Sequence, residues 1–303
     1  MKAKKTMKVG LLGYPLDHSL SPAIHNAAYQ ALGLDWHYRL YPCSNQQTFD
    51  EVLGGACKEP DAYVGFNVTT PYKAAAYKAA SKRSCSAEAA ESANVLTVLC
   101  QAGSGQPLLS CDNTDGQGLV ASLERQAGIS VSDSVVILCG TGSVARATLR
   151  LLLEKQAAGI VVASRDKQAA QKRVNALLSY SHCPSHAAPP SVIDYGEIAQ
   201  HLAVADVLID ATTVGMASTD EAVVPVELLR QDMVVVDVVY AHGETALIQG
   251  ARERGAKAFD GLGMLIEQAA LSIEIWAQAQ GLKLEAPREL MQKAAHQELA
   301  NRL

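Results

Sequence analysis

The sequence predicts an α/β protein with two domains, the second of which is built on a doubly wound parallel sheet. Three observations support this fold class. Short apolar runs rich in β-branched residues, which are typical of buried strands, alternate with segments of helical periodicity. The run Val135–Cys139 leads directly into the turn Gly140-Thr141-Gly142 and then into a helical pattern. The length of 303 residues is sufficient for two domains of ordinary size.

The composition indicates a globular protein and argues against several functional classes. Apolar residues make up 49% and charged residues 19% of the chain, and the formal net charge is -5. This charge argues against a nucleic-acid partner, and no apolar run is long enough to cross a bilayer. The seven cysteines include no CxxC pair, so we expect reduced thiols in a cytoplasmic protein. His182 and His186 flank Cys183 in a Pro/Ser-rich stretch, which favours a solvated loop over a metal site.

The first domain is predicted over residues 1–111 and is expected to be completed by C-terminal helices within 264–303. Alternation and apolar runs predict its strands, over 8–13, 35–41, 62–68 and 92–100. Helices are expected after Ser21-Pro22 and after Thr70-Pro71. A hydroxyl residue is a favoured N-cap, and proline is a favoured first helical residue.

Three side chains of this domain are candidates for chemistry. Ser19 and Ser21 lie at a strand–helix junction, where hydroxyl groups can face a ligand. Capping alone would explain Ser21, whereas Ser19 has no such role. Lys73 is placed in the first turn of a helix, where the helix dipole disfavours a cation. We therefore treat Lys73 as a candidate acid or base, the alternative being an ordinary solvated lysine.

The second domain is predicted over residues 112–263. Asp115 falls at the start of a helix that Gly128 ends, where a negative charge is favoured, although helix capping explains this residue equally well. Further strands are expected over 160–164, 205–211, 233–238 and 256–259. Further helices are expected over 143–153, 167–178, 245–254, 262–280 and 287–302. Ligands of such a sheet bind at the carboxyl ends of its strands.

The glycine turn itself predicts an anion site. Gly140 and Gly142 carry no Cβ, so backbone N–H groups can approach an anion closely. The helix that begins near Ser143 presents unpaired N–H groups and the positive end of its dipole. Ala145 stands where the helix packs on the strand, which the dinucleotide motif allows. The sequence thus predicts a Rossmann-type dinucleotide-binding domain, the alternative being a βα turn that binds nothing.

Eight short blocks resemble those of the shikimate 5-dehydrogenase family, in the family's order and over nearly the whole chain. This family also includes quinate/shikimate dehydrogenases and shikimate-dehydrogenase-like proteins. The blocks are HSLSPAIHN, NVTTPYK, SAN, NTDGQG, GTGSVAR, DATTVGM, DVVY with a later Thr, and GLGMLIEQ. Together they are far more specific than one glycine turn.

The resemblance implies an oxidoreductase that reversibly reduces 3-dehydroshikimate to shikimate with NADPH, in the biosynthesis of chorismate and the aromatic amino acids. A monomer or homodimer is expected, with no nucleic-acid or membrane partner. By the same resemblance, Lys73 and Asp115 form the catalytic pair. The implied substrate residues are Ser19, Ser21, Asn67, Thr69, Asn94, Asp115, Tyr240 and Gln268. The implied cofactor residues are Gly140, Thr141, Gly142, Ser143, Val144, Ala145, Ser164, Arg165, Thr212, Val238 and Gly261.

Two departures from the family pattern leave alternatives open. Ser143 replaces a glycine that is usual in the turn. At the end of the second strand, Arg165 suits the 2′-phosphate of NADP, whereas Asp166 suits the free 2′-hydroxyl of NAD. NADP is preferred because Arg165 keeps the family position. The alternatives are a quinate/shikimate dehydrogenase paralogue that uses NAD, and a non-catalytic dinucleotide-binding protein.

Overall fold

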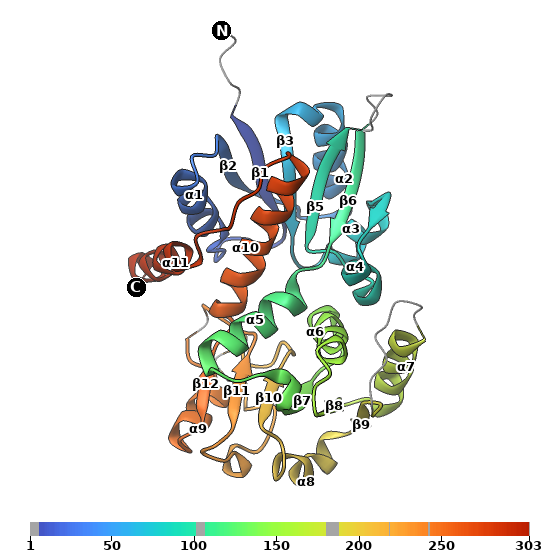
Figure 1. The fold of residues 1–303 in the computed structure, drawn as a ribbon, viewed down its shortest axis with the longest axis vertical. Helices are drawn as coiled ribbons and strands as arrows, with labels where there is room; N and C mark the ends of the chain where they lie inside the picture. Colours follow the sequence, from blue (N-terminus) through green and yellow to red (C-terminus); the bar gives the residue numbers. More distant parts are fainter. Residues whose placement is uncertain (1–5, 101–106, 180–187, 218, 242, 303) are drawn as a thin grey trace. The chain divides into compact units, whose positions relative to one another are not determined.

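The computed structural model describes residues 6–100, 107–179, 188–217, 219–241 and 243–302 (Figure 1). The chain forms two compact units, one of residues 1–114 with 268–303 and one of residues 115–267. The stretch with His182, Cys183 and His186 lies outside the described residues. Each unit contains its own six-stranded sheet.

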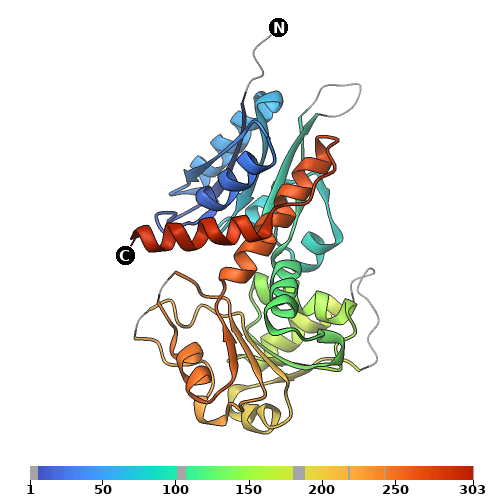
Figure 2. The same cartoon turned by 60° about the vertical axis from the view of Figure 1, so that its left-hand side comes forward.

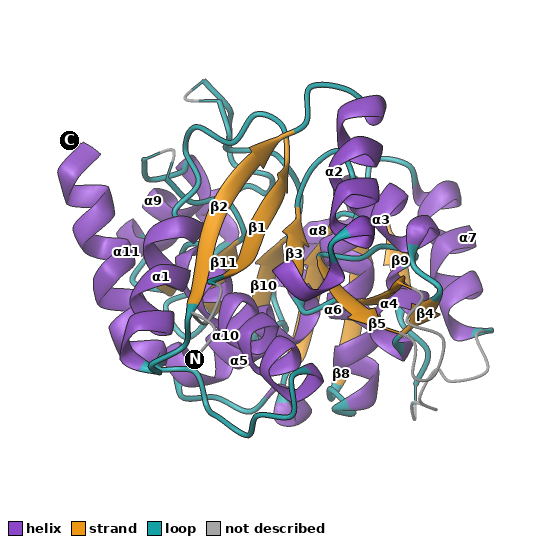
Figure 3. Cartoon of the chain, turned by 90° about the horizontal axis from the view of Figure 1, so that it is seen from above, coloured by secondary structure: helices purple, strands orange, loops and turns teal. Residues whose placement is uncertain are grey.

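The sheet of the first unit is mixed, with the strand order β2-β1-β3-β5-β6-β4. β1 pairs in parallel with β2 and β3 (Figure 3), whereas β5 runs antiparallel to both β3 and β6 (Figure 1). The four predicted strands are present, and β4 and β6 are additional. The strands are β1 (Met7–Gly13), β2 (Trp36–Pro42), β3 (Tyr63–Val68), β4 (Lys82–Arg83), β5 (Val95–Cys100) and β6 (Pro107–Asp112).

Helices from both ends of the chain pack on this sheet. The first and last helices, α1 and α11, lie against each other (Figure 2). α10 docks through Trp276, which is fully buried and donates its indole N–H to the carbonyl of Leu96 at 3.0 Å. The helices are α1 (Ser21–Ala31), α2 (Gln46–Lys58), α3 (Lys73–Ala79), α4 (Cys85–Ala90), α10 (Leu262–Ala279), α11 (Arg288–Arg302) and the 3₁₀ turn η1 (Pro60–Ala62). Among the described residues, no helix has both the length and the apolar character needed to span a membrane.

Two predicted N-caps of this unit are wrong. Ser21 is the first residue of α1, and the N-cap position is taken by Leu20 without a side-chain hydrogen bond. α3 begins at Lys73 with Tyr72 at its N-cap, so Thr70 does not cap it. α1 thus starts one residue earlier, and α3 two residues later, than the Ser/Thr-Pro pattern predicts. The prediction that Lys73 lies in the first turn is confirmed.

The sheet of the second unit is entirely parallel, with the strand order β12-β11-β10-β7-β8-β9. Numbered from β7, this is the order 3-2-1-4-5-6 of a Rossmann fold, in which the direction of winding switches between β7 and β10. The predicted doubly wound sheet is confirmed. Its strands are β7 (Val135–Cys139), β8 (Gly159–Ala163), β9 (Ser191–Ile193), β10 (Val207–Asp210), β11 (Val234–Asp237) and β12 (Lys257–Phe259).

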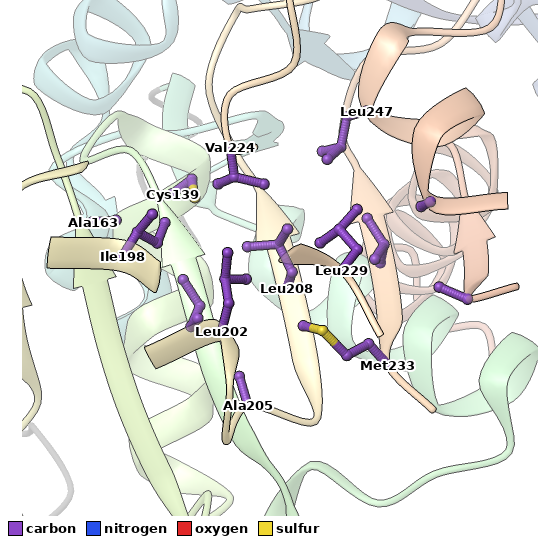
Figure 4. Packing of buried hydrophobic residues seen from close by; sticks show 14 of the residues in the cluster. Cys139, Ala163, Ile198, Leu202, Ala205, Leu208, Val224, Leu229, Met233 and Leu247 are labelled. Atoms are coloured by element: carbon purple, nitrogen blue, oxygen red, sulfur yellow. The ribbon is translucent and has the colours of Figure 1, made fainter. Parts of the chain in front are cut away.

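Helices cover both faces of this parallel sheet. Leu138 and Val162 face the side of α6 and α7, where they line one small hollow with Leu149 and Val174. Alternate strand residues face the other side and pack with residues of α8 and α9, such as Leu202 and Leu247 (Figure 4). The helices are α5 (Asp115–Ala127), α6 (Ser143–Glu154), α7 (Lys167–Leu178), α8 (Ile198–Leu202), α9 (Ala246–Glu253) and the 3₁₀ turns η2 (Val131–Asp133), η3 (Tyr195–Glu197) and η4 (Val226–Leu228).

Candidate active site

Asn67 lies near the carboxyl end of β3, and its buried amide is held by three hydrogen bonds. Its Oδ1 accepts from the hydroxyl of Tyr38 at 2.9 Å. Its Nδ2 donates to Ser272 Oγ at 2.9 Å and to the carbonyl of Asn94 at 3.2 Å. These partners come from β2, α10 and the residue before β5, so the orientation of the Asn67 amide is fixed from three sides.

Asn94 joins the same cluster. Its Oδ1 accepts from the backbone N–H of Thr114 at 2.8 Å, and its Nδ2 donates to Gln268 Oε1 at 3.2 Å. The hydroxyl of Thr114 donates to the carbonyl of Gln268 at 3.2 Å. Three residues that the family resemblance assigns to the substrate, Asn67, Asn94 and Gln268, are thus brought into one hydrogen-bonded network of the first unit. Their contact with a substrate stays a prediction.

The hydroxyl of Tyr38 provides a direct test of this network. We expect Tyr38→Phe to lower the free energy of unfolding by about 1–3 kcal/mol, because Asn67 Oδ1 is buried and loses the donor that faces it. Urea denaturation of the full chain measures this change. Tyr14→Phe is the control, since Tyr14 is 52% exposed. Equal midpoints for the two variants would contradict a stabilising role of this hydrogen bond.

The two candidate serines lie at the start of α1 with different surroundings. Ser19 is half-buried, and its Oγ accepts from the backbone N–H of Ser21 at 3.2 Å. Ser21 is buried and makes no capping hydrogen bond. The local structural role therefore belongs to Ser19, the reverse of the sequence interpretation. The guanidinium of Arg302 on α11 donates to the carbonyl of Ser19 at 3.0 Å, which ties this junction to the last helix.

The backbone around both catalytic candidates is anchored on one segment of the first unit. The carbonyl of Lys73, a half-buried residue, accepts from the N–H of Ala93 at 2.9 Å. The side chain of Asn94, the residue after Ala93, accepts from the N–H of Thr114. Asp115 follows Thr114 directly, begins α5 and is 3% exposed. Lys73 belongs to the first unit and Asp115 is the first residue of the second, and their pairing stays a prediction.

The second unit carries a glycine turn with the features of a phosphate site. Gly140 has a φ of +97°, and a Cβ on Gly142 would meet nothing within 4 Å. Gly142 is the N-cap of α6, so no side chain satisfies the first N–H groups of this 12-residue helix. These N–H groups and the dipole of α6 therefore favour an anion over the turn, and a dinucleotide pyrophosphate fits both the open backbone and the charge.

Other predicted cofactor residues lie at the carboxyl ends of neighbouring strands. Thr212 follows β10, and a Cβ on Gly140 would lie 3.1 Å from its methyl group. Its backbone N–H donates to Asp210 Oδ1 at 2.9 Å. Gly261 lies against the carbonyl of Val238 so closely that a Cβ there would overlap the backbone. Two pairs of predicted residues, Gly140 with Thr212 and Val238 with Gly261, are thus neighbours within the second unit.

The corner after β8 carries both Arg165 and Asp166, in different surroundings. Asp166 is the N-cap of α7, where its Oδ1 accepts from the N–H of Ala169 at 2.9 Å. Its own N–H donates to Ser164 Oγ at 3.3 Å. The carboxylate is therefore engaged in holding the helix start, whereas the side chain of Arg165 is exposed at the same corner.

Comparison with known proteins places the chain in a family. Residues 11–96 match the model of the shikimate dehydrogenase substrate binding domain. A protein of Methanopyrus kandleri named shikimate dehydrogenase (NADP(+)) is 33% identical over 97% of both chains. The chain belongs to the shikimate dehydrogenase family. The resemblance seen in the eight sequence blocks is confirmed.

Solved structures of the family show the same fold. The crystal structure of a shikimate dehydrogenase in complex with NADP⁺ has a TM-score of 0.83 and 30% sequence identity, and covers 97% of this chain and 96% of its own. A quinate dehydrogenase from Corynebacterium glutamicum in complex with NAD has a TM-score of 0.79 and 26% identity, and covers 97% of this chain and 100% of its own. Structures with this fold therefore include a shikimate dehydrogenase in complex with NADP⁺ and a quinate dehydrogenase in complex with NAD.

Sequence reasoning missed a buried acidic group beside the glycine turn of this family member. Asp210, the last residue of β10, is 1% exposed and lies in register with Asp237 and Cys139 on the neighbouring strands. Burial, and to a lesser degree the charge of Asp237, raises the pKa of Asp210 to about 7. Its Oδ2 has no hydrogen-bond partner among the described residues. The sequence signal for this group was that two apolar runs each end in an acidic residue, Asp210 and Asp237.

Proposed function

We propose that this chain is a shikimate dehydrogenase that catalyses 3-dehydroshikimate + NADPH + H⁺ ⇌ shikimate + NADP⁺. The observation that carries the proposal is the full-length match to a relative named shikimate dehydrogenase (NADP(+)), 33% identical over 97% of both chains. Fold alone would not establish turnover. Lys73 and Asp115 stand at the positions that match the family's catalytic pair, so the chain has the acid–base groups that the reaction needs.

The reduction adds a hydride and a proton to a ketone, and NADPH supplies the hydride when it is bound. Negative charge develops on the ketone oxygen and must be stabilised. The ammonium group of Lys73 is proposed to stabilise this charge and to deliver the proton, and in the reverse direction its amine removes the proton. Asp115 is proposed to orient Lys73 and to hold a ring hydroxyl of the substrate.

The remaining proposed substrate residues position a carboxylated polyol. Hydroxyl groups at the start of α1 suit its carboxylate, because they donate hydrogen bonds beside the positive end of a helix dipole. Amide side chains suit ring hydroxyls, since they both donate and accept. The proposed set is Ser19, Ser21, Asn67, Thr69, Asn94, Tyr240 and Gln268.

The dinucleotide is proposed to lie along the carboxyl edge of the second unit's sheet. The turn from Gly140 to Ala145 would hold the pyrophosphate, and Thr212, Val238 and Gly261 would line the path of the nicotinamide half. At the adenosine end, Ser164 and Arg165 would hold the ribose. NADP is favoured over NAD because Asp166 is engaged as a helix cap, which leaves Arg165 to meet a 2′-phosphate.

We further propose that the enzyme works in the cytoplasm, as a monomer or homodimer, on a small-molecule substrate without a nucleic-acid partner. Five cysteines in the described part of the chain are free thiols, which agrees with a reducing compartment. The formal net charge of -5 gives nucleic acid no electrostatic attraction.

Turnover on four substrate–cofactor pairings tests the proposal. We expect kcat/KM to be highest for shikimate with NADP⁺, measured as the rate of NADPH formation by the full chain. A higher value for quinate with NAD⁺ would instead identify the NAD-dependent paralogue, which the likeness to the quinate dehydrogenase keeps as the second candidate. Nucleotide binding without turnover of either acid would identify a non-catalytic dinucleotide-binding protein.

A further inference from the structure

A second arginine contacts the glycine turn from α7, the helix that follows the corner formed by Ser164, Arg165 and Asp166. α7 starts directly after Asp166, and its residues Ala170, Val174 and Leu177 are buried. The neighbouring Arg173 is exposed, and its Nη1 donates to the hydroxyl of Thr141 at 2.5 Å. Thr141 is the residue between the two glycines of the turn. The guanidinium of Arg173 is therefore held beside the backbone that is shaped for phosphate.

The surroundings of this guanidinium are basic. Gly140, Thr141, Arg146 and Arg173 line a small hollow between α6 and α7, and the other described residues around it are apolar. The acidic side chains of Asp166, Asp194 and Glu197 near this corner are all engaged. Asp166 caps α7, Asp194 accepts from the N–H of Gly196 at 2.8 Å, and Glu197 pairs with Lys167 at 2.6 Å. Because none of these carboxylates pairs with Arg173, a ligand phosphate would meet its positive charge directly.

We propose that Arg173 is a specificity-determining residue that binds the 2′-phosphate of NADP together with Arg165. This inference rests on the proposed function. In a Rossmann fold the adenosine ribose lies between the glycine turn and the end of the second strand, so Thr141 and Arg165 flank it. The planar guanidinium matches a phosphate, and a hydrogen bond to an anion is stronger than the bond to a neutral hydroxyl. Arg173 therefore exchanges its bond to Thr141 for the phosphate when NADP binds.

Calorimetric titration of the full chain with two nucleotide probes tests this role without turnover. The probes are 2′,5′-ADP, which carries the 2′-phosphate, and 5′-AMP, which lacks it. We expect Arg173→Gln to raise the Kd of 2′,5′-ADP about tenfold and to leave that of 5′-AMP unchanged. The matched control is Lys172→Gln, which removes an exposed charge from the adjacent position of the same helix. The control should leave the ratio of the two Kd values as in the wild type.

Two results for Arg173→Gln would overturn the proposal. Equal losses for both probes would show that Arg173 only supports the turn through Thr141. Unchanged Kd values for both probes would show that Arg173 does not bind the nucleotide. Thr141→Val removes the hydroxyl without a charge and should preserve the preference for 2′,5′-ADP. A wild-type chain that does not prefer 2′,5′-ADP would instead contradict NADP as the cofactor, which separates failure of the proposed function from failure of this inference.

Discussion

Replacing Lys73 by alanine is expected to lower kcat for shikimate oxidation about 10²–10⁴-fold, the range typical of a lost general acid or base. The reason is that no ammonium group would stabilise the charge on the reacting oxygen or carry its proton. The fold should survive the change, because the hydrogen bond that anchors this position, from Ala93 N–H, uses the backbone carbonyl of Lys73. Steady-state kinetics with shikimate and NADP⁺ measure the effect.

Lys78 provides the matched control, since it is an exposed lysine on the same helix α3. Lys78→Ala should retain wild-type kcat and the same thermal midpoint as Lys73→Ala. Addition of small primary amines should restore part of the activity of Lys73→Ala only. Full activity of Lys73→Ala would remove this side chain from the chemistry, whatever the family match implies.

The fold of the second unit follows from the sequence because its signals are local. β7, β8, β10 and β11 are apolar runs, as expected where a parallel sheet is covered on both faces. β9 (Ser191–Ile193) was not predicted, because its three residues are too few to mark a strand. The glycine turn marks the first strand–helix junction, and Asp166, placed directly before the helical pattern of α7, is a readable N-cap. That last signal also bears on the choice between NADP and NAD, because it engages Asp166 at the helix start. The sequence interpretation weighed Asp166 as a ligand for ribose or as a solvent-facing residue and overlooked its capping role.

The first unit was harder to predict, and its missed elements show why. β6 (Pro107–Asp112) is antiparallel to β5, and its apolar residues are too few to mark a strand without knowledge of the pairing. α2 buries Phe49, Leu53 and Ala56 at helical spacing and has Asn45 as its N-cap, so its signal was present. Gly54 and Gly55 obscured this signal, and in the structure both face open space. Contacts over long sequence distances, such as Asn67 with Ser272, have no local signature.

Replacing Asp210 by asparagine is expected to stabilise the protein above neutral pH by about 4 kcal/mol, because each unit of pKa shift is worth about 1.4 kcal/mol. Burial of the carboxylate raises its pKa from 3.8 to about 7. Asparagine keeps an oxygen to accept from the N–H of Thr212, as Asp210 Oδ1 does at 2.9 Å. It removes the charge on Oδ2, for which the described residues provide no partner. Chemical denaturation at a series of pH values measures the difference.

The direction of this pH dependence follows from how many protons the folded and unfolded chains bind. Below pH 3.8 Asp210 is protonated in both the folded and the unfolded chain, so the buried group carries no penalty from charge. Between pH 3.8 and about 7 the unfolded chain loses this proton while the folded chain keeps it. The folded state then binds more protons, and its stability falls as the pH rises. Above about pH 7 the difference between the wild type and Asp210→Asn becomes constant.

Two aspartate variants separate this effect from a general change of charge. Asp232→Asn removes an exposed carboxylate whose pKa is lowered by its hydrogen bond to Arg230, so it should not stabilise the chain at high pH. Asp237→Asn removes the acid on the next strand, but both of its oxygens accept hydrogen bonds, from Val239 N–H and Thr245 Oγ1. Asparagine would leave one of these donors without an acceptor, so any gain should be smaller than at position 210. Parallel stability curves for the wild type and Asp210→Asn from pH 4 to 9 would show that Asp210 ionises normally in the folded chain.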